Sequence, residues 1–412
     1  MRLAFLCLAW QLGFTANVWA QLKPVLPQHA PLSSDALGSP GIDAGDYVYV
    51  SGQGPRRPDG STPPNFAEQV RQSLENVRTI VEAAGLTIDH VVYVQVYLED
   101  MHQYGSLDKA FADYFPKGPP ARGVLGVARL PERSVQISAV AVRDLKDKQP
   151  VVLPNVKPNP AYSLGMLTHD RLFVSTMLGS DPANGKGPAN PGAQVDFALD
   201  RLKMVVEAAG LSLSHMVFVN PYLTSEIPMR IMNEHYARRF EFGNTPGRAT
   251  IEVSSLPEGA HIAYTGVAVR DLAQRRAIRP KNMPPSPTAS PCVFAGDTLY
   301  CSAKSGFIPG PNGGVFTATT TDQVRQTMRN LLDNLEEAGM NFDQVVSTTI
   351  YLDDLSESAA FGKVYRKYFG GVLPAQTTVQ QIPSADRKPD EEGHYPDLEQ
   401  VSLIAVRSAV NH

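Results

Sequence analysis

The stretch QVRQSLENVRTIVEAAG (Gln69–Gly85) recurs as QVDFALDRLKMVVEAAG (Gln194–Gly210) and as QVRQTMRNLLDNLEEAG (Gln323–Gly339). In the first copy, apolar residues follow helical spacing from Val70 to Val81. The glycine that closes each copy tolerates the positive φ that ends a helix. Each copy therefore predicts an amphipathic helix, and the repetition predicts three copies of one structural unit.

The segments around these helices repeat as well. Each helix is followed by a segment in which polar and apolar residues alternate and which is rich in β-branched and aromatic residues. This pattern predicts a strand. A second predicted helix, which ends in aromatic residues, comes next. A Pro-x-Arg or related tripeptide, another strand, a Leu-Pro or Ile-Pro pair and a closing apolar strand follow. We therefore predict three α+β units, at residues 21–150, 151–279 and 280–412, with Pro-rich connectors near both junctions.

Composition restricts the class of protein. The chain has 412 residues, of which 43% are hydrophobic and 19% charged, so it is globular and long enough for two or three domains. The formal net charge is -4, and no basic stripe is visible. A nucleic-acid partner is therefore not expected, because Lys and Arg supply most of the non-specific affinity for phosphate.

The N-terminus predicts export. Arg2 precedes an apolar run from Leu3 to Phe14, and small or modest residues lead to Ala20, which is the order of a secretory signal cleaved after residue 20. The run is shorter than the roughly 20 residues that span a bilayer, so no membrane association is expected after cleavage. The protein is thus predicted to be periplasmic or secreted. A buried N-terminal helix is the alternative.

Two cysteines follow the predicted signal, Cys292 and Cys301. The residues between them, VFAGDTLY, have apolar arms around Gly296 and Asp297, which predicts a tight hairpin. With those two residues as the turn, the cysteines lie opposite each other in a non-hydrogen-bonded pair, where side chains are closer. We predict a disulfide, consistent with an oxidising compartment. Two reduced core cysteines are the alternative.

Four motifs recur in order in the three copies: SGQGP at Ser51, the Gln69–Gly85 helix, VVYVQVYLEDM, and PARGVLGVARLPE followed by AVAV. Together they resemble the Rid (reactive intermediate deaminase) family, also described as L-PSP endoribonuclease-like proteins. The resemblance implies a chorismate-mutase-like fold, with a mixed sheet and two helices on one face of each unit. Family members are homotrimers with a small-molecule cleft at each subunit interface. This chain therefore resembles a covalently linked trimer, expected to be a monomer in solution.

The resemblance also assigns site residues. In the family an arginine of the Pro-x-Arg tripeptide binds the substrate carboxylate, and this role falls on Arg122 and Arg248, whereas the third copy has Gln376. A guanidinium grips a planar carboxylate through two parallel charge-assisted bonds, which an amide cannot match. At most two clefts are thus expected to keep this function. Without the resemblance, a surface or interface salt bridge is the simpler interpretation of each arginine.

The second copy retains most of the polar residues found at the family's site positions, so this copy is predicted to be the one most able to keep a functional site. Arg248, Tyr162 and Asn233 are the predicted catalytic residues, although each also fits a purely structural role. Thr176 replaces the glycine that follows the family serine, Ser175. The predicted substrate-binding residues are Ser175, Thr176, Thr250, Arg122, Ser51, Gly52 and Asp108.

One family residue is missing. Family deaminases have a glutamate on the last strand that is thought to position the attacking water, and the aligned positions here are Gln136, Ala263 and Gln400. An amide can hydrogen-bond a water but cannot exchange a proton as a tuned carboxylate does. Period-two alternation places Glu252 on the strand face of Arg248, so Glu252 is a candidate replacement. A local salt bridge is its alternative role.

The resemblance implies an exported deaminase that hydrolyses small 2-imino acids to 2-keto acids and ammonia, without a cofactor. Family substrates arise mainly in the cytoplasm, so predicted export also favours an alternative, a non-catalytic protein that binds small carboxylates. An endoribonuclease is a third reading, against which acidic net charge and export both argue. The nine histidines show no metal-ligand spacing, so no metal is expected.

Overall fold

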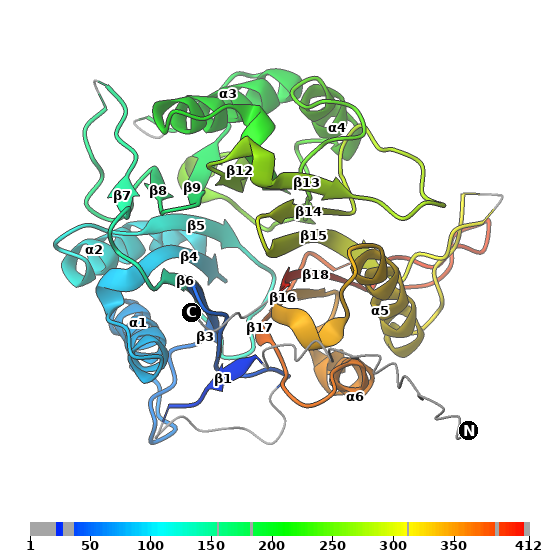
Figure 1. Ribbon diagram of the computed structural model, residues 1–412, viewed down its shortest axis with the longest axis horizontal. Helices are drawn as coiled ribbons and strands as arrows, with labels where there is room; N and C mark the ends of the chain where they lie inside the picture. Colours follow the sequence, from blue (N-terminus) through cyan, green and yellow to red (C-terminus); the bar gives the residue numbers. More distant parts are fainter. Residues whose placement is uncertain are drawn as a thin grey trace, which may run out of the picture.

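The computed structural model describes residues 22–27, 37–154, 156–181, 184–310, 313–383 and 387–407. The predicted signal segment, residues 1–20, lies outside these residues. Within them, no helix has the length and apolar character needed to cross a membrane. Three units surround a common centre, with their sheets facing inward and their helices on the outside (Figure 1).

Unit 1 has a six-stranded mixed sheet in the order β1-β2-β3-β6-β4-β5. Among the described strands of this sheet, β4 and β5 form the one parallel pair, as expected for strands joined by a helix. The elements are β1 (Lys23–Val25), β2 (Gly41–Asp43), β3 (Tyr47–Gln53), α1 (Phe66–Ala83), β4 (Val91–Leu98), α2 (Tyr104–Tyr114), β5 (Ala121–Gly126) and β6 (Val135–Val142).

Unit 2 repeats this topology, with the strand order β7-β8-β9-β12-β10-β11. Its edge strand β11 is short and pairs in parallel with β10. The elements are β7 (Gln149–Pro150), β8 (Gly165–Leu167), β9 (Arg171–Leu178), α3 (Pro191–Ala208), β10 (Met216–Leu223), α4 (Met229–Ala237), β11 (Ile251–Glu252) and β12 (Ile262–Val269).

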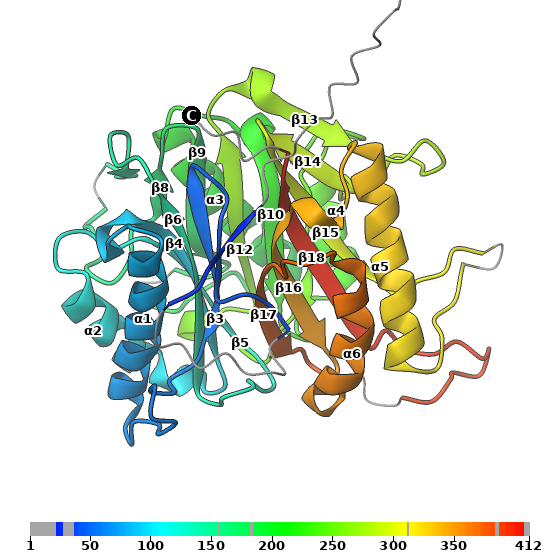
Figure 2. The same ribbon diagram turned by 60° about the horizontal axis from the view of Figure 1, so that its bottom comes forward.

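Unit 3 has the order β13-β14-β15-β18-β16-β17. Strands β7 and β13 belong to the second and third sheets, so these sheets begin slightly before the predicted boundaries at residues 151 and 280. The elements are β13 (Arg275–Ile278), β14 (Cys292–Ala295), β15 (Thr298–Ser305), α5 (Thr320–Glu337), β16 (Val345–Leu352), α6 (Ser358–Tyr365), β17 (Ala375–Gln380) and β18 (Glu399–Val406). Figure 2 shows α5 and α6 outside this sheet.

The three predicted long helices are present, and local chemistry explains their ends. Side-chain oxygens cap the N-termini: Asn65 accepts a hydrogen bond from the Glu68 backbone N–H, and Thr319 caps α5 in the same way. Gly85, just past α1, has a φ of 77°, a conformation that glycine adopts without steric cost. The face of α1 that includes Val70 and Val81 is buried against the sheet, which explains the apolar periodicity.

The predicted cysteine hairpin is also present. Strands β14 and β15 pair with Cys292 opposite Cys301, and Ala295 opposite Thr298. The two cysteine sulfurs form a disulfide. Both cysteines are fully buried, so the bridge lies in the core of unit 3.

Equivalent positions of the three units meet near the centre. Tyr47, Arg171 and Thr298 are the first residues of β3, β9 and β15. The Arg171 guanidinium lies 4.3 Å from the Tyr47 ring centroid and donates a 2.8 Å hydrogen bond to Thr298 Oγ1. Arg171 also donates to Tyr300 Oη at 3.0 Å and to Asp170 Oδ2 at 3.0 Å. One buried arginine therefore connects all three units.

Polar and aromatic side chains surround an interior cavity of about 120 Å³ between the sheets. It is lined by residues of all three units. Burial raises the pKa of the tyrosines there, so their hydroxyls stay protonated. The lining tyrosines are Tyr49, Tyr93, Tyr97, Tyr222, Tyr300 and Tyr351.

Unit 3 has two carboxyl groups with raised pKa values close together in sequence, the half-buried Asp397 and the buried Glu399. Glu399 on β18 is fully buried; it accepts a hydrogen bond from the Thr327 hydroxyl, and its Oε2 has no hydrogen-bond partner in the described part of the chain. Burial raises the pKa of Glu399 well above its usual range, and burial raises the pKa of Asp397 to about 7. Both groups therefore keep their protons to a higher pH in the folded chain than in the unfolded chain.

These raised pKa values predict that unit 3 loses stability as pH rises. Relative to an unfolded value of about 3.9, the folded pKa of about 7 for Asp397 makes deprotonation progressively destabilising from about pH 4 to pH 7. We expect Asp397→Asn to remove part of this slope and to stabilise the protein at pH 8 by about 1–3 kcal/mol. Denaturant unfolding from pH 4 to pH 8 measures the difference. An identical pH dependence in both proteins would contradict the prediction.

Candidate functional site

Arg122 lies on β5, the edge strand of unit 1, where unit 1 contacts unit 2. The Arg122 backbone N–H donates a 2.7 Å hydrogen bond to Ser175 Oγ on β9. The Val124 backbone N–H donates a 2.8 Å hydrogen bond to Thr176 Oγ1 on the same strand. The serine and threonine of unit 2 thus satisfy backbone groups of unit 1 that an edge strand would otherwise leave unpaired. The cleft at Arg122 is built by both units.

The Arg122 guanidinium is enclosed by aromatic rings and one carboxylate. Its side chain is 1% exposed, and NH2 forms an ion pair with Asp108 of α2. The guanidinium carbon lies 5.6 Å from the ring centroid of Tyr104, 4.8 Å from that of Phe111 and 5.0 Å from that of Tyr162. These distances are within the range of cation–π attraction, so the rings help to hold the charge in a buried position.

Two nitrogens of Arg122 remain free. Its Nε and NH1 are buried and have no hydrogen-bond partner within the described residues. A buried donor without an acceptor costs free energy, and more so when it is charged. A ligand carboxylate offers two oxygens for such donors and forms charge-assisted bonds with them. The arrangement is suited to a small anionic group.

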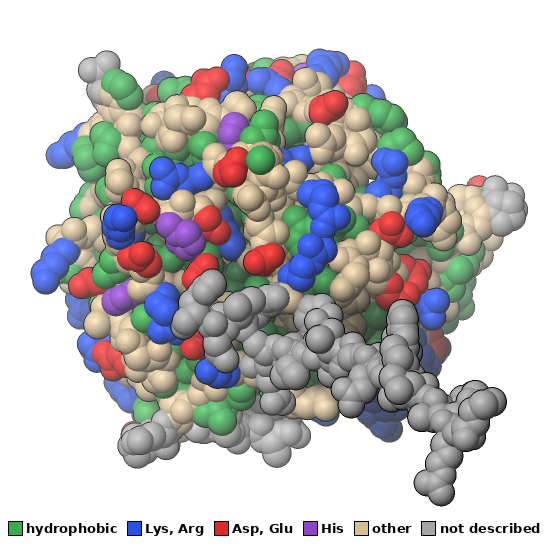
Figure 3. Space-filling view, in the orientation of Figure 1, with side chains coloured by type: hydrophobic (Ala, Val, Ile, Leu, Met, Phe, Trp, Pro, Cys, Tyr) green, Lys and Arg blue, Asp and Glu red, His purple; other side chains and the backbone are tan. Residues whose placement is uncertain are grey.

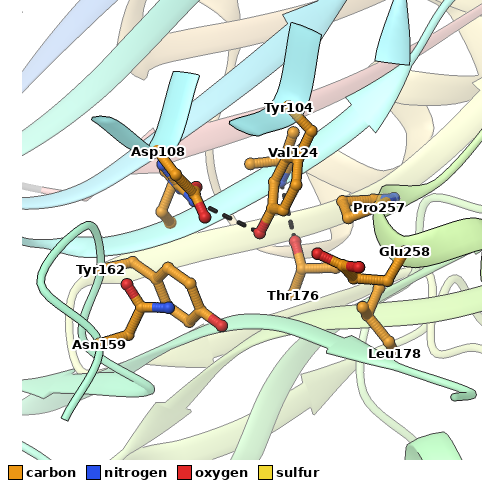
Figure 4. A pocket seen from close by; sticks show the side chains of 10 residues that line it. Tyr104, Asp108, Val124, Asn159, Tyr162, Thr176, Leu178, Pro257 and Glu258 are labelled. Carbon is orange, nitrogen blue, oxygen red and sulfur yellow. Dashed lines mark hydrogen bonds and ion pairs between the residues drawn. The ribbon is translucent and has the colours of Figure 1, made fainter. Parts of the chain in front are cut away.

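A pocket of about 70 Å³ opens beside this arginine, and Figure 4 shows the side chains that line it. Burial raises the pKa of Tyr104 and the pKa of Tyr162, so both hydroxyls remain protonated and can hydrogen-bond a ligand. Unit 1 contributes Tyr104, Asp108 and Arg122 to the lining, and unit 2 contributes Tyr162, Thr176 and Glu258.

The prediction of one complete site in the second copy is wrong. Tyr162 and Ser175 of unit 2 face Arg122 of unit 1, not Arg248. Within each unit, the strand bearing the serine contacts one neighbour, and the edge bearing the tripeptide contacts the other. Residues that adjoin in one copy of the sequence are therefore divided between two clefts. The Arg122 cleft collects Arg122, Asp108, Tyr162, Ser175 and Thr176.

Arg248 lies at the junction of units 2 and 3. Its backbone N–H donates a 2.8 Å hydrogen bond to Ser302 Oγ, and its NH1 donates to Asn233 Oδ1 at 2.7 Å. Burial lowers the pKa of Arg248. Thr250 Oγ1 is buried without a hydrogen-bond partner in the described chain. The structure therefore brings Arg248 and Asn233 together, as predicted, but Ala289 stands where the other cleft has Tyr162.

The third junction joins units 3 and 1, and its residues include Ser51 and Gly52. Ser51 donates a 2.8 Å hydrogen bond to the Pro40 carbonyl. A Cβ on Gly52 would lie 2.7 Å from the Gln136 side chain and 3.0 Å from that of Thr377, so only glycine allows this close approach. The Gln376 amide donates to Thr378 Oγ1. No arginine stands at the tripeptide position of this junction.

Glu252, the candidate replacement acid beside Arg248, is exposed on β11. The Arg122 pocket is a different cleft, and Glu252 does not line it. Sequence reasoning missed Tyr104 and Glu258, which do line it. Glu258 follows the Leu-Pro or Ile-Pro pair that marks each copy, and this pair was the available signal. Within the described residues, no group of His, Cys, Asp and Glu side chains could hold a metal ion.

Three mixed sheets, each covered by helices, and an arginine cleft built between units define a protein of three fused Rid-like, chorismate-mutase-like units. The family comparison supports this class over most of the chain. The model of the family described as Endoribonuclease L-PSP matches residues 28–143, 154–269 and 282–384. The chain belongs to this family.

Similar proteins match one unit at a time. The 2-iminobutanoate/2-iminopropanoate deaminase of Escherichia coli K12 is 37% identical over 128 residues, which is 29% of this chain and 98% of that protein. The RutC family protein PH0854 of Pyrococcus horikoshii is 36% identical over 109 residues, 26% of this chain and 86% of its own length. A solved structure, E. coli TdcF with bound serine, is 34% identical, covering 30% of this chain and 99% of its own, with a TM-score of 0.29.

Proposed function

We propose that the Arg122 cleft hydrolyses small 2-imino acids to 2-keto acids and ammonia in an exported protein. The single observation that carries this proposal is the buried Arg122 side chain, with two unpartnered nitrogens beside a pocket. Family membership and 37% identity to a 2-iminobutanoate/2-iminopropanoate deaminase support the reaction. The predicted signal at residues 1–20 supports export.

The charges of the cleft fit this substrate class. The substrate carboxylate would accept charge-assisted hydrogen bonds from the Arg122 guanidinium, and the opposite end of the molecule would face Glu258. A protonated imine is cationic, so it is attracted by carboxylates at that end. Holding the imine in a fixed orientation next to a water molecule accelerates hydrolysis, because orientation no longer has to be reached by chance.

The reaction is tested by ammonia release from freshly generated 2-iminopropanoate and 2-iminobutanoate. We expect the wild-type protein to accelerate release above the spontaneous rate in proportion to its concentration. The expressed chain should begin after residue 20, where the predicted signal is expected to be cleaved. Release at the spontaneous rate with both substrates would refute the deaminase proposal.

A second candidate is a non-catalytic protein that binds small carboxylates. It is favoured by Gln136, Ala263 and Gln400, which occupy the positions of the family glutamate. This function requires the same Arg122 donors but no turnover. A small carboxylate such as pyruvate would then raise the unfolding temperature, and ammonia release would remain at the spontaneous rate.

RNA cleavage is a weaker candidate than imine hydrolysis or carboxylate binding, although the description of the matched family model includes the word endoribonuclease. Basic and acidic side chains are interspersed on the face drawn in Figure 3, and the net charge is -4.

We also propose that one chain is the functional assembly. Fusion of the three units makes their association independent of protein concentration.

A further inference from the structure

We infer that Glu258 is the proton-transfer residue of the Arg122 cleft. This inference rests on the proposed imine hydrolysis and assigns its acid–base step to a residue outside the position of the family glutamate. Glu258 belongs to the short turn Pro257–Gly259 of unit 2, which precedes β12. Its side chain lines the pocket, and in Figure 4 Glu258 and Asp108 extend from opposite sides.

The carboxylate of Glu258 is free to act. It forms no hydrogen bond or ion pair with the described part of the chain, whereas the other carboxylate of the lining, Asp108, is paired with Arg122. The Asp108 carboxylate is thus already engaged by the Arg122 guanidinium. The tyrosines of the lining are poor proton acceptors, because burial raises their pKa values further above neutrality. Glu258 is the remaining acid–base group among the lining residues.

The equivalent glutamate of unit 1 has a different environment. Glu132 follows Leu130 and Pro131 as Glu258 follows Leu256 and Pro257. Its Oε1 lies 3.5 Å from Nε of Arg56, and its Oε2 accepts a 3.3 Å hydrogen bond from the Arg56 backbone N–H. Glu132 is therefore held by its own unit. Of these two glutamates, only Glu258 lines the Arg122 pocket without such a partner.

The backbone of Glu258 also differs from that of Glu132. Glu258 has a φ of 55°, in the left-handed region, whereas in unit 1 the positive φ values fall on Arg133 and Ser134. For a residue with a Cβ this conformation costs on the order of 1–2 kcal/mol. Strain of this kind is concentrated at functional sites, where the surrounding structure maintains it. The Ala260 N–H to Pro257 carbonyl hydrogen bond, at 3.1 Å, closes the turn.

The chemistry requires one group that both accepts and returns protons. The oxygen of a water molecule forms a bond to the imine carbon, the C=N electron pair moves to nitrogen, and one water proton moves to Glu258. Glu258 then passes this proton to the nitrogen. The remaining hydroxyl proton follows the same route as the C–N bond breaks, so ammonia leaves and the C=O bond forms. Carboxylates in this role typically contribute 10²–10⁴-fold to a rate.

The test compares Glu258→Gln with the matched control Glu132→Gln. Glutamine keeps the shape and the hydrogen-bonding capacity of the side chain but removes its proton exchange. We expect Glu258→Gln to lower kcat for 2-iminopropanoate by about 100-fold or more, with KM changed by less than about threefold. Glu132→Gln should retain wild-type kcat.

The outcomes separate this inference from the proposed function. If the wild-type protein turns over and the kcat of Glu258→Gln is within threefold of the wild-type value, the role of Glu258 is overturned. The proposed deaminase function is then unaffected. Equal losses in the two variants also overturn it, because the effect would not be specific to this cleft. A wild-type protein without turnover removes both proposals. Circular dichroism and denaturant unfolding of each variant establish that the fold is unchanged.

Discussion

Replacement of Arg122 by Gln is expected to reduce kcat/KM for 2-imino acid hydrolysis by roughly 100- to 10,000-fold. The substitution reproduces the residue of the third copy, Gln376, at the same place in the tripeptide. Hydrogen bonds to a charged group contribute about 1.5–3 kcal/mol each, and two of them would be lost with the guanidinium. Each 1.4 kcal/mol corresponds to about tenfold in rate, which gives the expected range.

Arg248→Gln is the matched control, because Arg248 occupies the same position in unit 2 but lacks a tyrosine equivalent to Tyr162. We expect this variant to keep most of the wild-type kcat/KM. Steady-state ammonia release, measured for both variants over a range of substrate concentrations, gives kcat and KM separately. Loss of activity in Arg248→Gln with retention in Arg122→Gln would place the reaction in the other cleft.

The second large effect is expected at the centre of the molecule. Arg171→Met should lower the free energy of unfolding by about 3 kcal/mol, because it leaves the Asp170 carboxylate without its guanidinium and removes the hydrogen bonds to Thr298 and Tyr300. Methionine fills much of the arginine stem volume, so the loss reports the polar contacts and the stacking on Tyr47.

Denaturant unfolding of Arg171→Met measures this effect, and Arg238→Met serves as its control. Arg238 pairs with Glu234 on the surface of unit 2, and its side chain is 60% exposed. Exposed pairs of this kind contribute about 1 kcal/mol or less. If the two substitutions destabilised the protein equally, Arg171 would not be a connection between units.

Most of the fold could be predicted because its determinants are local and repeated. The helix at Gln69–Gly85 and its two copies combine apolar periodicity with a terminal glycine, and both features act within a few residues. The disulfide between Cys292 and Cys301 followed from a two-residue turn, because alternation in a hairpin determines which residues face each other.

The candidate site was predicted residue by residue but assembled incorrectly. Sequence analysis selected Arg122, Tyr162 and Ser175, and the structure brings all three together. It grouped Tyr162 with Arg248 because both lie in one copy of the repeat. Which unit supplies which side of a cleft depends on how complete sheets pack, and no local pattern in the chain records that packing. Glu258 was missed for the same reason, since its role depends on facing Arg122 across a junction.

The amino-acid sequence by itself determined the three units, their secondary structure, the cysteine pairing and the residue types available for chemistry, because each depends on short-range periodicity or on repetition. The tertiary structure alone decided which of those residues meet. At the centre it places Tyr47, Arg171 and Thr298 together, an arrangement that three identical subunits could not form, because each equivalent position would then hold the same residue. At the junction of units 1 and 2 it places Arg122 and Glu258 in the lining of one pocket, because the edge strand of one sheet packs against the next.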